Sequence, residues 1–115
     1  MGSIWSEEAK FQSWLDVEIA VCEVWTKLGK IPQSSLENIK KKASFTVDRI
    51  EEIEKEVEHD LIAFTTAVAE NIGEDSRYVH MGLTSYDVED TALSLRLKAS
   101  ADIIIDDISR AVTAL

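Results

Sequence analysis

Residues 80–93, HMGLTSYDVEDTAL, bring together side chains that suit the binding of an anionic substrate. Thr84 stands before a long stretch of helical periodicity, with Asp87 three residues later, which is close to a capping box. Ser85 adds a second hydroxyl where free backbone N–H groups and the helix dipole attract an anion. Gly82 lets the backbone come close to such a ligand. The motif therefore predicts a helix start that also holds a carboxylate or a phosphate.

The two histidines of the chain, His59 and His80, lie on either side of one apolar segment. His59 is followed by Asp60, and two interpretations are open. In the first, Asp60 caps the following helix and the histidine is incidental. In the second, the imidazole lies near a reacting group, and a neighbouring carboxylate or a ligand sets its tautomer. No cysteine or carboxylate stands at a spacing that would complete a tetrahedral metal site, so we expect neither a metal nor a cofactor.

The elements that must position these residues are helices, because apolar residues recur at spacings of three and four and no strand pattern is present. Ser6 followed by two acids is a typical helix start, and Gly29 and Gly73 are typical helix ends. Ser34 or Ser35 is expected to lead the second helix. The sequence predicts helices at residues 6–28, 34–42, 45–58, 59–72 and 84–115, with a loop at 74–83.

The last predicted helix is unusually long for the size of the chain. Residues 84–115 contain no Gly or Pro and would span about 48 Å. Their apolar positions keep helical spacing to the end of the chain, which is typical of one strut in a larger helical bundle. We expect a helical amino-terminal domain at 1–83 and the truncated start of a long-helix bundle domain at 84–115. The apolar positions are Val88, Ala92, Leu95, Ala99, Ile103 or Ile104, Ile108, Val112 and Leu115.

The composition excludes several classes of partner. The chain has 115 residues and a formal net charge of −10, whereas nucleic acids and anionic membranes bind basic surfaces. No apolar run approaches the ~18 residues of a membrane span, and the first residues lack the pattern of a secretory signal. Cys22, the one cysteine, is expected to be a buried thiol in a reducing compartment. The expected location is the cytoplasm.

Three stretches in this order resemble the amino-terminal part of the adenylosuccinate lyase family, in the aspartase/fumarase superfamily. The family's first helix is similar to IWSEEAKFQSWLDVEIAVCEVWTKLGKIP. Its segment with a His-Asp pair is similar to ASFTVDRIEEIEKEVEHDLIAFTTAV. Its HxGLTSxDxxDTA motif, which is specific, is similar to EDSRYVHMGLTSYDVEDTALSL. The resemblance runs over essentially the whole chain from Ile4.

The resemblance implies an all-α fold and a homotetramer built around a central bundle of long helices. It implies a β-elimination that cleaves adenylosuccinate to AMP and fumarate, and the related succinyl carboxamide ribotide (SAICAR) to AICAR. It also implies that His59 and Asp60 contact the substrate, with His59 supporting catalysis near the reacting centre. By the same resemblance, His80 lies in the site as a binding or supporting histidine. Thr84 and Ser85 bind a carboxylate of the succinyl group.

The sequence also departs from the family pattern. The family's opening Arg-Tyr-Ser segment, used for the substrate phosphate, does not precede Met1, and Glu58 stands where relatives often carry Arg or Asn. The family's histidine general acid and serine base would lie beyond Leu115. We therefore expect an amino-terminal fragment that holds part of a composite site and is inactive alone.

Two alternatives stay open. The first is a stand-alone helical interaction module whose last helix dimerises; the lack of a closing cap on that helix argues against it. The second is another superfamily member, such as argininosuccinate lyase or fumarase, and the Leu-Thr pair before Ser85 argues against that.

Overall fold

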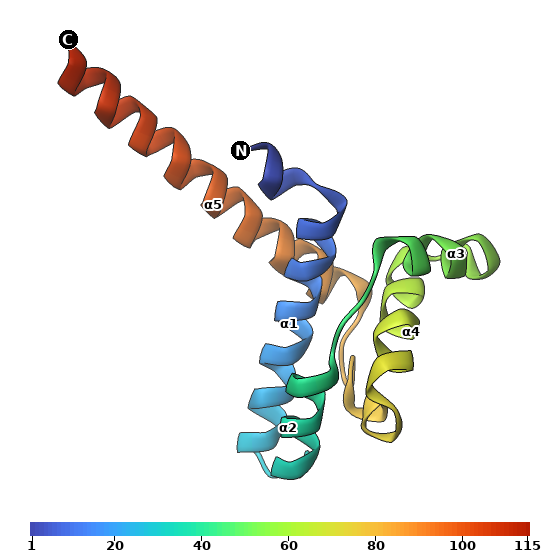
Figure 1. Ribbon diagram of the computed structural model, residues 1–115. Coiled ribbons are helices and arrows are strands. Elements are labelled where there is room, and N and C mark those ends of the chain that lie inside the picture. Colours follow the sequence, from blue (N-terminus) through green and yellow to red (C-terminus); the bar gives the residue numbers. More distant parts are fainter.

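The protein is built from helices alone, as the sequence predicts. The computed structural model describes residues 1–115 and contains no strand. In Figure 1 the first two helices lie side by side, the next two cross one another, and one long helix leads away from these two helix pairs. The elements are η1 (Gly2–Trp5), α1 (Glu7–Lys27), α2 (Gln33–Lys42), α3 (Val47–Val57), α4 (Asp60–Ile72), η2 (Glu74–Tyr78) and α5 (Ser85–Ala114), where η marks a 3-10 helix.

Most helix ends follow the expected capping signals. Ser6 Oγ accepts a hydrogen bond from the Ala9 N–H at 3.1 Å, which starts α1 as predicted. The predicted start of α2 was wrong, because that helix begins at Gln33 directly after Pro32, which fixes the entry without a side-chain cap. The predicted loop at 74–83 is in part helical, since its first half forms η2.

The core is one cluster in which aromatic rings meet at its centre. Phe64 is fully buried; its ring stacks on Phe11 at 5.9 Å and meets the edges of Trp14 at 5.5 Å and Phe45 at 6.0 Å. These rings come from α1, from α4 and from the connection before α3, so the cluster ties the two helix pairs together. The buried apolar residues are Phe11, Trp14, Leu15, Val17, Cys22, Ile31, Leu36, Ile39, Ile50, Ile53, Leu61, Ala63, Phe64, Ala67, Val68, Ile72, Val88 and Ala92.

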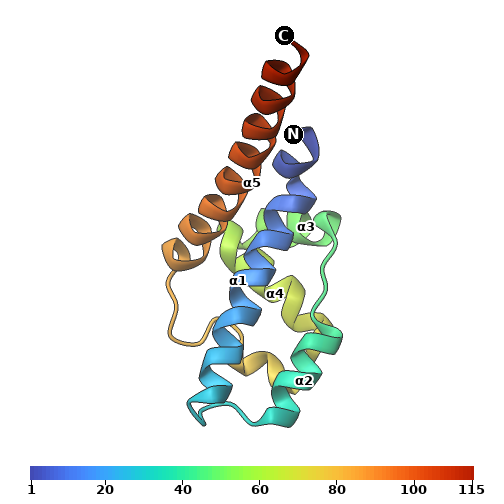
Figure 2. The same ribbon diagram turned by 90° about the vertical axis from the view of Figure 1, so that its left-hand side faces the viewer.

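Helix α5 begins beside α1 and then extends away from the other helices, as Figures 1 and 2 show. Only Val88, Ala92 and Ser100 are buried on it. Trp5 Nε1 donates to Ser100 Oγ at 3.0 Å, and this bond ties η1 to the middle of α5. Of the apolar positions named from the sequence, Leu95 is 49 % exposed. None of the helices is both long and apolar enough to cross a membrane.

The apolar stripe of α5 lies on the side that the rest of the chain does not cover. It is exposed because the chain contacts α5 at Val88 and Ala92, which lie largely opposite to the stripe, and buries no residue of α5 after Ser100. We call this surface the α5 stripe. It consists of Leu93, Leu97, Ile104, Ile105, Ile108, Val112 and Leu115, each at least 42 % exposed.

Candidate functional site

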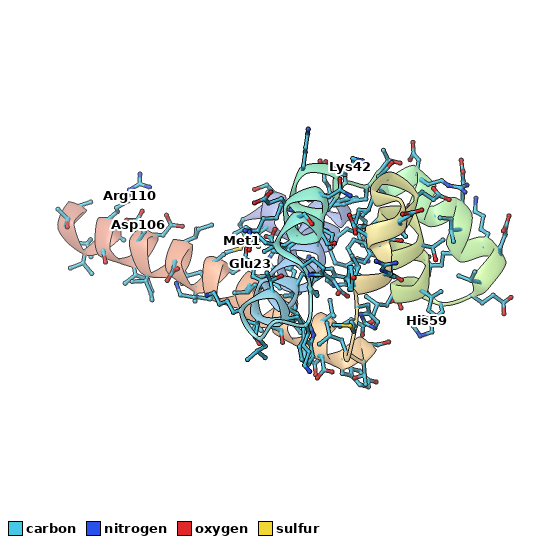
Figure 3. All side chains as sticks on the ribbon, turned by 90° about the horizontal axis from the view of Figure 1, so that it is seen from below. Met1, Glu23, Lys42, His59, Asp106 and Arg110 are labelled. Carbon is cyan, nitrogen blue, oxygen red and sulfur yellow. The ribbon has the colours of Figure 1, made fainter.

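The start of α4 presents His59 as its N-cap residue. His59 Nδ1 accepts a hydrogen bond from the Ile62 N–H at 3.3 Å, while Asp60 Oδ1 accepts from the adjacent Leu61 N–H at 2.8 Å. The interpretation of Asp60 as the cap was therefore wrong. Because Nδ1 acts as an acceptor, the neutral ring carries its proton on Nε2, which faces outward as a donor. Figure 3 shows His59 at the outer surface of the molecule.

At the start of α5, the hydroxyls of Thr84 and Ser85 differ in their hydrogen bonds. Asp87 Oδ2 accepts from the Thr84 backbone N–H at 2.8 Å and from the Thr84 hydroxyl at 3.2 Å. Thr84 is thus held within the helix start, as the capping-box pattern predicts. The half-buried Ser85 hydroxyl makes no hydrogen bond within the chain, so it is free to donate to a ligand at the helix N-terminus.

The starts of α4 and α5 share one surface. Glu89, in the first turns of α5, lies within electrostatic range of Asp60 and His59. Burial raises the pKa of the Glu89 carboxyl, and the charge of Asp60 raises it further, whereas His59 and Lys10 act in the opposite direction. This surface therefore combines two helix N-termini, a histidine and several carboxylates, with Lys10 as its nearby cation.

His80 has a partner that the sequence analysis missed. Its Nδ1 lies 2.6 Å from Oε1 of Glu18, which is 1 % exposed although it is an acid. Burial raises the pKa of the Glu18 carboxyl, and the hydrogen bond to His80 opposes that rise. No hydrogen bond or ion pair joins His80 to His59 or to the hydroxyls at the start of α5.

One face of α1 holds the segment that carries His80. Along this face Glu18 bonds His80, Cys22 Sγ contacts the Tyr78 carbonyl oxygen at 3.7 Å, and Trp25 Nε1 donates to the Met81 carbonyl oxygen at 3.0 Å. The three α1 side chains stand at i, i+4 and i+7, so they share one side of the helix. Burial, with the nearby acids, raises the pKa of Cys22 to about 11, which keeps its thiol protonated as the donor.

Gly82 lets this segment come close to α1. Its φ is +77°, and a Cβ there would lie 3.2 Å from Cζ2 of Trp25. The backbone at Gly82 thus approaches a tryptophan ring, and its approach to an anion stays a prediction. Glu58 likewise has φ of 53° as the C-cap of α3, a left-handed conformation that asparagine adopts more readily than glutamate.

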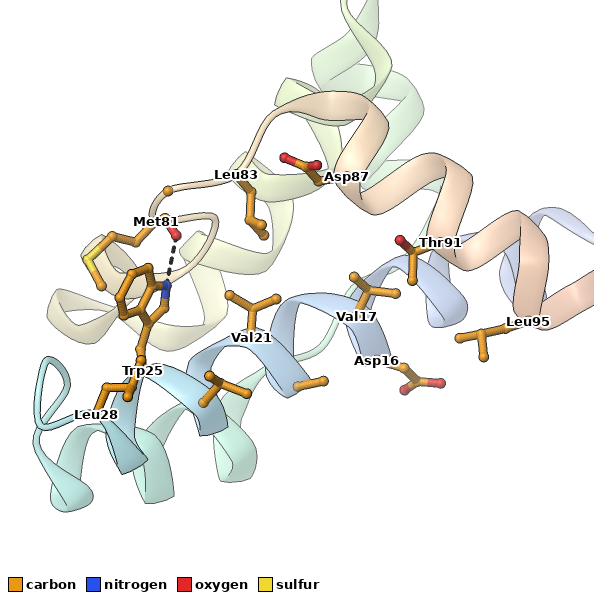
Figure 4. A pocket seen from close by; sticks show the side chains of 13 residues that line it. Asp16, Val17, Val21, Trp25, Leu28, Met81, Leu83, Asp87, Thr91 and Leu95 are labelled. Atoms are coloured by element: carbon orange, nitrogen blue, oxygen red, sulfur yellow. Dashed lines mark hydrogen bonds between the residues drawn. The ribbon is translucent and has the colours of Figure 1, made fainter.

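A separate apolar groove of about 680 Å³ lies between α1, the segment at 81–83 and the start of α5. Figure 4 shows Val17, Val21 and Trp25 along one side and Leu95 on the other, with Asp87 at its edge. It contains none of the five site residues predicted from the sequence. The candidate site is accordingly the polar surface at the starts of α4 and α5 and not this groove, and His80 is a separate candidate residue that Glu18 holds.

Comparison with known proteins shows which protein family the chain belongs to. Residues 1–115 match the family described as Lyase, and the chain belongs to this family. Over all of its 115 residues the chain is 53 % identical to the adenylosuccinate lyase of Synechocystis sp.. It is 52 % identical over 113 residues to that of Aquifex aeolicus and 51 % identical over 112 residues to that of Bacillus subtilis. The predicted family is confirmed.

The chain spans about a quarter of the length of these relatives. It covers 27 % of the Synechocystis protein and 26 % of the Aquifex aeolicus protein. A solved structure described as fumarate lyase from Mesorhizobium sp. BNC1 aligns with a TM-score of 0.80 at 21 % identity, over 89 % of this chain and 25 % of that one. The expected all-α fold is thereby confirmed.

Proposed function

We propose that this chain is the amino-terminal part of an adenylosuccinate lyase, which eliminates fumarate from adenylosuccinate and from SAICAR. The observation that carries the proposal is identity of about half of all residues to adenylosuccinate lyases along the whole chain. The site geometry supports it, because His59 and the free hydroxyl of Ser85 lie at two helix starts that share one surface. The substrate carries carboxylates and a phosphate, which suit such donors.

The reaction explains why these residue types are useful. A base removes a proton from the carbon next to a carboxylate while an acid protonates the departing nitrogen. Negative charge grows on that carboxylate, and hydrogen-bond donors in fixed positions stabilise it. In this proposal Ser85 and the N-terminus of α5 hold a carboxylate of the succinyl group, with Thr84 shaping the helix start. His59 Nε2 donates near the reacting carbon, and Asp60 and His80 contact the substrate.

The remaining parts of the proposal concern the setting of the site. We place residues 1–83 in an amino-terminal helical domain and residues 84–115 at the start of a long-helix bundle domain. The whole enzyme is a cytoplasmic homotetramer, and the general acid and base come from residues outside this chain. Lys10 is the one lysine or arginine that acts on Glu89. Because this surface has so few cations of its own, we propose that other segments complete the site.

The chain alone is predicted to show no elimination activity, because neither the general acid nor the general base of the proposal belongs to it. The measurement is the absorbance of adenylosuccinate over time with the purified 115-residue chain. Preparation from a host lacking its own adenylosuccinate lyase excludes contamination. Turnover by the chain alone would show that its own residues supply both proton-transfer groups and would overturn this assignment.

A hybrid lyase tests the proposed function directly. In it, this chain replaces the matching segment of the Synechocystis adenylosuccinate lyase, to which it is 53 % identical. We expect the hybrid to cleave adenylosuccinate and to leave argininosuccinate and malate unchanged. Activity on argininosuccinate or malate instead would favour another superfamily member. A folded, tetrameric hybrid without any of these activities would contradict the lyase assignment.

We also predict that the chain associates with further copies through the α5 stripe. Exposed apolar surface of this kind marks an interface, because water contact with so many large side chains is unfavourable. Sedimentation at micromolar concentration should show a dimer or a larger species. The double variant Leu97→Glu with Ile104→Glu should sediment as a monomer. Thr113→Glu, on another side of α5, is the matched control. A monomeric parent chain would contradict this prediction.

A further inference from the structure

Glu18, the buried partner of His80, has no role in the proposal above, and the geometry of this pair is unusual. A carboxylate that is 1 % exposed is rare unless a partner compensates it. Its Oε1 lies 2.6 Å from His80 Nδ1, whereas Oε2 is buried and has no hydrogen-bond partner. The compensation therefore depends on this one contact.

The backbone of His80 is arranged to make that contact. His80 has φ of +66°, in the left-handed region that is uncommon for residues other than glycine. Residues in such conformations persist where the surrounding structure fixes them, and they occur often at functional sites. Here Cys22 and Trp25 hold the chain on either side of His80, so the imidazole is presented to α1 by a segment fixed at both ends.

The contact also decides which ring nitrogen is available. Because Nδ1 faces Glu18, Nε2 is the nitrogen left for a ligand, and the His80 side chain is 28 % exposed. Two proton arrangements leave the pair without net charge. Either the imidazolium faces the carboxylate, or the neutral carboxylic acid donates to Nδ1 of the neutral ring. In both arrangements Nε2 carries a hydrogen.

The third arrangement, a carboxylate beside a neutral imidazole, places an uncompensated charge in the interior. It is disfavoured because Oε2 of Glu18 has no donor and water does not reach it. Raised pKa at Glu18 from burial agrees with this, since burial favours the uncharged pair.

We propose that Glu18 is a positioning residue of the lyase site, which holds His80 by Nδ1 so that Nε2 faces the substrate as an N–H donor. The identity of the substrate rests on the proposed function; the link between Glu18 and His80 does not. Glu18 itself touches no substrate. It acts through the imidazole, as a buried carboxylate orients a histidine in many sites.

The first experiment observes the imidazole in the chain itself. In an NMR spectrum of the chain with ¹⁵N-labelled histidine, His59 and His80 each give one set of imidazole signals. The set that is absent in His59→Asn belongs to His59, so the other belongs to His80. We expect a strongly deshielded proton in the hydrogen bond between Nδ1 of His80 and Glu18, and a protonated Nε2, with the deshielded proton lost in Glu18→Gln. Ser13→Ala is the matched control, since Ser13 is buried on the same helix and bonds only the Lys10 carbonyl oxygen. An unchanged His80 spectrum in Glu18→Gln would overturn the proposal.

The second experiment measures kinetics in the hybrid lyase. Glu18→Gln should raise KM for adenylosuccinate by about 2- to 10-fold with little change in kcat, and the apolar Glu18→Met should raise KM further. In a His80→Asn background neither change should raise KM again, because the two residues act as one unit. Equal KM increases in both backgrounds would mean that Glu18 affects only packing, and this would overturn the proposal.

The two experiments separate this proposal from the proposed function. A hybrid parent with no lyase activity contradicts the function, whereas the His80 spectrum of the chain still tests the pairing. An active parent in which Glu18→Gln alters the spectrum but no kinetic parameter overturns the positioning role and leaves the lyase assignment standing.

Discussion

Phe64→Ala is expected to lower the free energy of unfolding of the chain by about 3–5 kcal/mol. Phe64 is fully buried and contacts Phe11, Trp14 and Phe45, so the truncation removes the centre of the aromatic cluster. The remaining rings come from two separate segments, α1 and the connection before α3, and the cavity between them cannot close without moving helices. A domain of this size is stable by about 5–15 kcal/mol, and the loss is therefore a large part of the total.

Urea unfolding followed by tryptophan fluorescence measures this loss, because Trp14 lies 5.5 Å from the Phe64 ring. Protein concentration must be held constant, since association also stabilises the folded state. Ile62→Ala on the same helix is the matched control: Ile62 is 50 % exposed, and its loss should cost about 1 kcal/mol or less. Equal unfolding midpoints for Phe64→Ala and the parent would mean that the aromatic cluster does not hold the helix pairs together.

The helices were predictable because local signals and the apolar pattern agree. Ser6, Thr46 and Thr84 each precede a helix as N-cap residues, and Gly29 and Gly73 end helices with positive φ. The α5 stripe was less predictable. Apolar residues occur on more than one side of α5, and only the packing of α1 and η1 decides which side is covered.

The missed partner of His80 left a signal in the sequence. Residues 11, 15, 18, 22 and 25 lie on one side of α1 at spacings of three and four, and Glu18 is the only acid among them. An acid at a core position requires a buried partner, which pointed to a histidine or a cation elsewhere. Which one it is depends on the left-handed turn at His80, and neighbouring residues do not reveal that turn.

The His59 cap was not predictable from propensity, because aspartate is the far commoner N-cap residue. In the structure the chain before α4 turns through Glu58, whose φ is 53°. That turn places the imidazole, and not the carboxylate of Asp60, over the free N–H of Ile62. In the proposed function, this cap leaves Nε2 of His59 as the ring nitrogen open to a substrate.

Ser85→Ala and His59→Gln are expected to change the kinetic parameters of the hybrid lyase in different ways. Ser85 is proposed to donate to a substrate carboxylate that gains charge as the adjacent proton leaves. Hydrogen bonds to charged groups contribute roughly 1.5–3 kcal/mol, so Ser85→Ala should lower kcat/KM by about 10- to 150-fold, with part of the loss in KM. Ser94→Ala, also on α5 and bonded only to the Asp90 carbonyl oxygen, should leave both parameters unchanged. If Ser85→Ala also changed neither parameter, the hydroxyl would not bind the carboxylate.

His59→Gln should mainly lower kcat and largely keep the substrate affinity, because Nε2 of His59 is proposed to donate near the reacting carbon. His59 also caps α4, and loss of a cap costs about 1 kcal/mol of stability. His59→Asn separates the two roles, since asparagine caps the helix but cannot reach as far as Nε2. Steady-state kinetics and equilibrium substrate binding should show reduced kcat for both variants, with normal unfolding for His59→Asn. Weakened binding with an intact kcat would instead limit His59 to holding the substrate in place.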